Sequence, residues 1–88
     1  MDDPYASLRK QLELEEWPNV YLFKFIVPNT SENIALTTAL FSDSSDISMH
    51  ESSTGKFVSV SVKELMLDVD SIIDKYRDAT KIKGLMAL

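Results

Sequence analysis

The sequence predicts an α+β domain in which strands and helices follow one another in the order βαββαβ, with a short extra helix in front. Three observations lead to this prediction. Residues 57–62 alternate between apolar and polar side chains, which is typical of a strand with one buried face. Residues 19–27 are apolar on both faces, as expected of a central strand, and residues 68–80 repeat apolar side chains at helical spacing.

The extra helix is predicted over residues 4–16. Pro4 suits a first helical turn, and Leu8 and Leu12 lie one turn apart on an apolar stripe. The helix is expected to end before Pro18, because a residue that precedes proline avoids the helical region.

The strand over residues 19–27 comes next and is closed by Pro28. Its side chains alternate between two faces. One face holds Tyr21, Phe23, Phe25 and Val27, and the other holds Val20, Leu22, Lys24 and Ile26.

Two further helices are predicted over residues 31–42 and 68–80. Thr30 and Ser31 offer capping oxygens to the first helix, and Asp68 is placed to cap the second. The apolar side chains of the first are Ile34, Leu36, Leu40 and Phe41, and those of the second are Val69, Ile72, Ile73, Tyr76 and Ala79.

The remaining strands are predicted over residues 46–53, 57–62 and 82–88. The first two are joined by a turn in which Gly55 allows a positive φ, so they should form a hairpin with the 46–53 strand at the edge. The hairpin side chains that should face the helices are Val58, Val60 and Val62.

These elements assemble in one way. Right-handed crossovers interleave the two βαβ units into a four-stranded antiparallel sheet of order 4-1-3-2, with both main helices on one face. This is the ferredoxin-like βαββαβ sandwich. We expect residues 1–16 to be a helical extension and residues 17–88 to be a single domain.

Charge and composition disfavour several classes of partner. The net charge is −5 and the basic residues are scattered, so nucleic acid and anionic membranes are unfavourable partners. The acidic start of the chain argues against a signal peptide, and no apolar run reaches the roughly 20 residues of a membrane span. The chain has no cysteine, which favours a cytoplasmic location and excludes thiolate metal sites.

No grouping of residues predicts catalysis, a metal or a cofactor. His50 is the only histidine and has no metal-ligand partners at a suitable spacing. Ser59 and Ser61 lie on a regular strand without an adjacent base, so we do not expect a nucleophile. Asp43, Asp46 and Glu51 lack the spacing of a calcium loop and are expected to be solvated. The chain is therefore not expected to be an enzyme.

The turn between the hairpin strands is rich in hydroxyl groups. It is not a phosphate-binding loop, because the glycine pattern is absent and the turn joins two strands. Ordinary turn chemistry explains it, and a polar rim that contacts a partner or a small ligand is the functional alternative. The rim consists of Ser52, Ser53, Thr54, Gly55 and Lys56.

The sheet face turned away from the helices is the candidate interaction face. Three alternatives remain for what covers its apolar side chains: the N-terminal helix through Leu8 and Leu12, a second copy of the chain, or a hydrophobic partner. The predicted face consists of Leu22, Lys24, Ile26, Phe57, Ser59, Ser61 and Lys63.

The chain resembles the YbeD-like family of small bacterial proteins in three stretches. Glu16-Trp17-Pro18 leads into Tyr21-x-Phe23-Lys24, residues 52–61 resemble the family's Ser-Ser-x-Gly-x-aromatic-x-Ser-Val-Ser hairpin, and Ile82, Leu85-Met86 and Leu88 form an apolar ending. The resemblance implies an ACT-like version of the ferredoxin-like fold and a regulatory role, but no catalytic residues. We therefore expect a non-catalytic regulatory or adaptor module that binds a small metabolite or a protein, as a monomer or a homodimer. The alternative is a purely protein-binding accessory subunit that uses the open sheet face or an edge strand.

Overall fold

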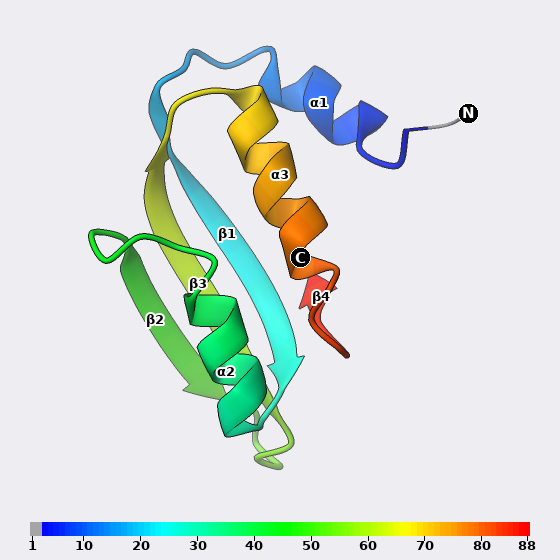
Figure 1. Cartoon of the computed structure of the whole chain (residues 1–88), viewed down its shortest axis with the longest axis vertical. Helices are drawn as coiled ribbons and strands as arrows, with labels where there is room; N and C mark the ends of the chain where they lie inside the picture. Colours follow the sequence, from blue (N-terminus) through cyan, green and yellow to red (C-terminus); the bar gives the residue numbers. More distant parts are fainter. Residues whose placement is uncertain (1–2) are drawn as a thin grey trace.

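The computed structural model describes residues 3–88 and contains one four-stranded antiparallel sheet with the order β2-β3-β1-β4 (Figure 1). This confirms the predicted ferredoxin-like topology. Two long strands lie in the centre and two shorter strands lie at the edges. The strands are β1 (Asn19–Pro28), β2 (Asp46–Glu51), β3 (Phe57–Met66) and β4 (Met86–Ala87).

Helices α2 (Ser31–Thr38) and α3 (Val69–Ala79) lie on one face of the sheet, and α1 (Ala6–Leu12) lies beside α3 (Figure 1). The predicted start of α3 is confirmed, because the Asp68 carboxylate accepts a hydrogen bond from the Ser71 backbone N–H at 2.8 Å. Thr30 caps α2 in the same way, accepting from the Asn33 N–H at 3.1 Å. Both caps satisfy backbone groups that a helix start leaves without a partner.

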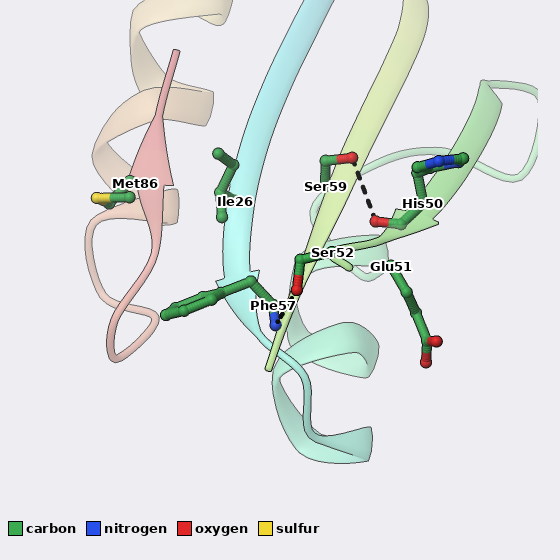
Figure 2. A pocket seen from close by; sticks show the side chains of 7 residues that line it. All are labelled: Ile26, His50, Glu51, Ser52, Phe57, Ser59 and Met86. Carbon is green, nitrogen blue, oxygen red and sulfur yellow. Dashed lines mark hydrogen bonds between the residues drawn. The ribbon is translucent and has the colours of Figure 1, made fainter. Parts of the chain in front are cut away.

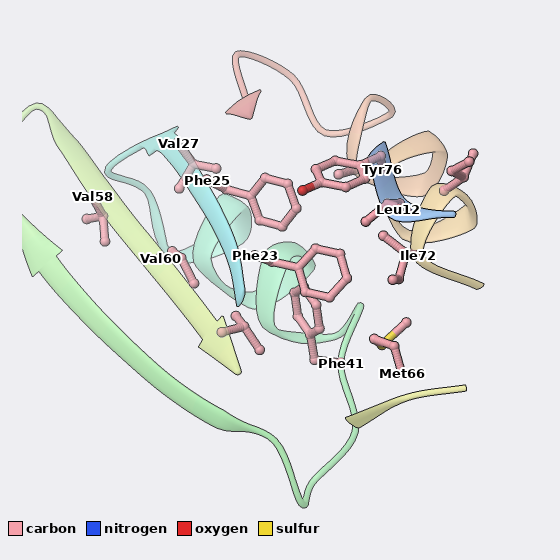
Figure 3. Packing of buried hydrophobic residues seen from close by; sticks show 13 residues of the cluster. Leu12, Phe23, Phe25, Val27, Phe41, Val58, Val60, Met66, Ile72 and Tyr76 are labelled. Carbon is pink, nitrogen blue, oxygen red and sulfur yellow. The ribbon is translucent and has the colours of Figure 1, made fainter. Parts of the chain in front are cut away.

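The core is built from alternate side chains of the two central strands (Figure 3). Phe23, Phe25 and Val27 of β1 are fully buried, as predicted from the period of two. Phe23 lies at the middle of an aromatic cluster, with ring centroids 5.1 Å from Phe41 and 5.5 Å from Tyr76. On β3 and α3 the buried side chains include Val58, Val60, Val62, Ile72 and Ile73.

Strand β3 is longer than predicted and continues to Met66. The prediction ended the strand at residue 62, and Glu64 then places a carboxylate where the alternation requires an apolar side chain. The structure satisfies that carboxylate, which accepts hydrogen bonds from the Ser42 N–H at 2.8 Å and from its hydroxyl at 2.7 Å. Lys75 Nζ lies 3.9 Å from the other carboxylate oxygen. The strand therefore continues past a residue that breaks the sequence pattern.

Several other predicted elements are longer than the observed ones. The predicted 31–42 helix ends at Thr38, and Leu36, which we assigned to its apolar side, is 46% exposed. The fully buried residue of α2 is Thr37, whose hydroxyl donates to the Asn33 carbonyl at 2.7 Å. The helix therefore buries a hydroxyl that its own backbone satisfies.

The final strand was predicted over residues 82–88, but β4 contains only two residues, Met86 and Ala87. The preceding chain turns through Gly84, which has a φ of +79° and lies directly against Pro28. Ile82 is buried, so the segment is held by packing before it joins the sheet. The predicted edge strand over residues 46–53 likewise ends at Glu51, because Ser52 already belongs to the turn.

The N-terminal helix does not cover the open sheet face, so the first of the three predicted covers is wrong. Arg9 forms an ion pair with Asp70 of α3 at 2.7 Å, and the Arg77 guanidinium lies over the Tyr5 ring. Leu12 reaches the same core as the helices and is buried. The helix is also shorter than the predicted residues 4–16. The apolar side chains of α1 pack against the core on the side of the sheet that carries the helices.

Candidate functional site: the open face of the sheet

The open face is assembled by the strand register. Val20 pairs with Leu65, Leu22 with Lys63, Lys24 with Ser61 and Ile26 with Ser59. Since neighbours across a sheet point to the same side, these pairs share the face opposite the helices. Strand β2 adds Asp46, Ser48 and His50, and β4 adds Met86 beside Ile26. The structure thus brings together all seven residues of the predicted face.

Apolar side chains gather at the two ends of this face. Ile26, Phe57 and Met86 form what we call the hairpin-end cluster, close to the β2–β3 turn. Val20, Leu22 and Leu65 form the far-end cluster. Five of the six are classed as exposed, with Leu22 at 52% and Phe57 at 43%. Helices α2 and α3 cover the opposite face, so this apolar surface is open to solvent.

The hairpin-end cluster surrounds a shallow hollow of about 360 Å³ (Figure 2). Figure 2 shows Ile26, Phe57 and Met86 projecting from three neighbouring elements, with Ser52, Ser59, His50 and Glu51 completing the lining. The Ser59 hydroxyl donates to the His50 main-chain oxygen at 3.3 Å. The hydroxyl is thereby used to link β3 to β2.

The polar rim is mainly a structural turn. Gly55 has a φ of +73°, and its N–H donates to the Ser52 oxygen at 2.9 Å. The Asn29 side-chain amide donates to the Gly55 oxygen at 2.9 Å and to Glu51 Oε1 at 3.0 Å. These bonds fasten the turn to the end of β1. Of the five rim residues, only Ser52 lines the hollow.

The open face is less acidic than the chain as a whole. The chain carries −5, whereas the strand positions on this face hold Lys24, Lys63 and one carboxylate, Asp46, and a second carboxylate, Glu51, lines the hollow. Asp46 is in register with Lys63. Lys24 lies between the two apolar clusters. Its neighbour on β3 is Ser61, and on the other side Leu88, which follows β4, donates its backbone N–H to the Lys24 carbonyl at 2.9 Å. Within residues 3–88, no ion pair involves Lys24.

Sequence reasoning left three apolar residues out of the predicted face. Val20 was assigned to the correct side of its strand but was not included in the interaction face. Leu65 was missed because the predicted strand ended before Glu64, and Met86 because its pairing partner was not assigned. Continuing the alternation from Lys63 to Leu65 would have found the second of these.

The other candidate residues remain apart from one another. Asp43 lies in the loop before β2, while Glu51 is engaged by Asn29 at the hairpin. Across residues 3–88, no three histidine or acidic side chains converge as a metal site would require. In the same part of the chain, every helix is too short or too polar to cross a membrane. No protein-family model, curated protein or solved structure matches the chain.

Proposed function

We propose that this chain is a non-catalytic binding module that docks a partner protein on the open face of its sheet. One observation carries the proposal: the two apolar clusters are exposed on a face that no element of the described chain covers. Exposed apolar clusters of this kind are unfavourable in water, and each Å² of them that a partner covers contributes about 25 cal/mol. The resemblance to the YbeD-like family adds a regulatory role to this proposal.

The extent of the surface favours a protein over a small metabolite. The hollow at the hairpin end is of the size that holds a small ligand. The apolar surface, however, continues to Val20, eight residues along β1 from Pro28. At about 3.3 Å per residue this is a length of roughly 26 Å. A metabolite in the hollow would leave the far-end cluster in water.

A second copy of the chain is a poor occupant because of Lys24. Stacking two open faces would bury two Lys24 ammonium groups. The strand positions of each copy carry two lysines, Lys24 and Lys63, but one carboxylate, Asp46, so the charges of two stacked faces do not balance. Burying a charge without a partner costs several kcal/mol. A different protein that brings its own carboxylate removes that cost.

The arrangement of Ser59 and His50 supports a role without catalysis. A serine nucleophile needs a base that accepts its proton. The Ser59 hydroxyl instead donates to the main-chain oxygen of His50, so the imidazole has no part in that bond. Binding, rather than turnover, is the activity that these residues support.

Site-specific photocrosslinking in the native host tests the proposal. A benzoylphenylalanine at position 22 should give one adduct whose mass differs from that of two chains. The same probe at position 36 is a matched control, because Leu36 lies on α2 and is similarly exposed, at 46% against 52% for Leu22. Adding Phe57→Asp should abolish the adduct at position 22.

Three results would contradict the proposal. They are equal adducts at positions 22 and 36, an adduct with the mass of two chains, and no adduct at position 22. A metabolite that raises the melting temperature equally in the wild type and in Leu22→Asp would instead place the ligand in the hollow.

A further inference from the structure

We infer that the segment docked on the open face is an amphipathic helix with an acidic side chain midway between two apolar ones. This inference rests on the proposed function and names the chemistry of its partner. It follows from the position of Lys24 between the hairpin-end and far-end clusters.

The occupant must satisfy its own backbone. Strand β1 pairs with β3 along its whole length and with β4 only at Phe25 and Ile26, so a segment that lies over the face, rather than along a sheet edge, meets side chains. A segment that lies on the face must therefore form its hydrogen bonds internally, which an α-helix does. A helix here adds a third layer to the fold, as helices do on both faces of many sheets.

The width of the face fits one helix. Phe57 on β3 and Met86 on β4 flank β1 on its two sides. Strands β3 and β4 lie two spacings apart, about 10 Å. An α-helix with its side chains is about 10–12 Å across. A helix that runs along β1 would therefore contact both flanking side chains.

The spacing along β1 sets the sequence of the helix. Leu22 and Ile26 are four residues apart in an extended strand, about 13 Å, with Lys24 midway. Positions i and i+8 of a helix are about 12 Å apart along the axis and about 80° apart around it, with i+4 midway, so all three fall within one broad apolar stripe. Apolar side chains at i and i+8 would cover the two clusters. An aspartate or glutamate at i+4 would meet the Lys24 ammonium, which a buried lysine requires.

Selection from a displayed library tests this pattern. The library would hold an 18-residue helical peptide with positions i, i+4 and i+8 randomised, and the wild-type protein would be the bait. We expect enrichment of Asp or Glu at i+4 and of Leu, Ile, Phe or Met at the outer positions. With Lys24→Glu as bait, the middle position should change to Lys or Arg. The peptide selected on the wild type should bind this variant about tenfold more weakly.

Lys63→Glu is the matched control, because Lys63 lies on the same face beside Asp46 rather than between the clusters. It should leave the preference at i+4 unchanged. Identical selections on the wild type and on Lys24→Glu, or no enrichment on the wild type, would overturn the inference. If peptides selected on the wild type, whatever residue they carry at i+4, lost binding to Leu22→Asp, the proposed function would stand without the inference. Equal binding to Leu22→Asp would count against both.

Discussion

The hydroxyl oxygens of Tyr21 and Tyr76 lie 2.9 Å apart and join the first strand to the last helix across the edge of the core. Tyr76 is 9% exposed, and burial, together with this hydrogen bond, raises the pKa of its phenol well above the ordinary value of 10.0. The fold therefore favours the neutral phenol. This stabilisation is present in full below about pH 10, where the unfolded chain is also neutral, and is lost as the pH rises above it.

Tyr76→Phe should lower the free energy of unfolding at pH 7 by about 1 kcal/mol, since one partly buried hydrogen bond is lost. The same substitution should flatten the fall in stability above pH 10, because the buried phenol that resists ionisation is gone. Urea unfolding of both proteins between pH 7 and pH 11 measures the two effects. An alkaline slope that is the same with and without Tyr76 would contradict the assignment.

Two phenylalanines on neighbouring strands provide a test of the two faces of the sheet. Phe23 is fully buried among aromatic rings, whereas Phe57 is 43% exposed on the open face. Phe23→Ala should cost about 3–5 kcal/mol, because it removes apolar contacts and leaves a cavity. Phe57→Ala should cost less than about 1 kcal/mol, since its ring remains half in water. Similar losses for the two variants in urea unfolding would show that the open face supports the fold.

Strand β3 was predictable because its two faces differ sharply in the sequence, with Val58 and Val60 alternating with Ser59 and Ser61. Residues 19–27 are apolar on both faces, so their pattern identified a central strand without deciding which face meets the helices. The pairing order followed from the sequence of elements and the handedness of the crossovers. The residues of the open face could therefore be predicted wherever the strand that carries them was predicted.

Features that depend on distant contacts were not predictable in this way. Nothing near Glu64 in the sequence shows that Ser42 will supply two hydrogen bonds to it, so the end of β3 was placed too early. The stripe of Leu8 and Leu12 shows that α1 has an apolar side. It does not show which surface that side meets. The ion pair between Arg9 and Asp70 forms only once α1 lies against α3.

Substitution of the two glycines distinguishes the cost of backbone strain from the cost of a steric clash. Both have positive φ, +73° for Gly55 and +79° for Gly84. A Cβ at Gly55 would meet nothing within 4 Å, whereas a Cβ at Gly84 would lie 2.7 Å from Cγ of Pro28. Gly55→Ala should therefore cost only the backbone strain, about 1–2 kcal/mol. Gly84→Ala should cost more and should loosen β4. Thermal unfolding compares the stabilities. Faster exchange of the Leu88 amide, which donates to the Lys24 carbonyl at 2.9 Å directly after β4, would report the loosening of that strand.

The last prediction concerns the charge between the two apolar clusters. If the Lys24 ammonium is what makes the open face a poor partner for itself, replacing it with leucine should join the clusters into one apolar stripe. Lys24→Leu should then dimerise at concentrations where the wild type is monomeric, because the dimer no longer buries two unpaired charges. Lys63→Leu adds the same apolar side chain beside Asp46 but leaves Lys24 in place, so it should remain monomeric. Sedimentation equilibrium of the three proteins decides the matter. A wild-type dimer, or equal dimerisation of the two variants, would show that Lys24 does not determine which occupant the face accepts.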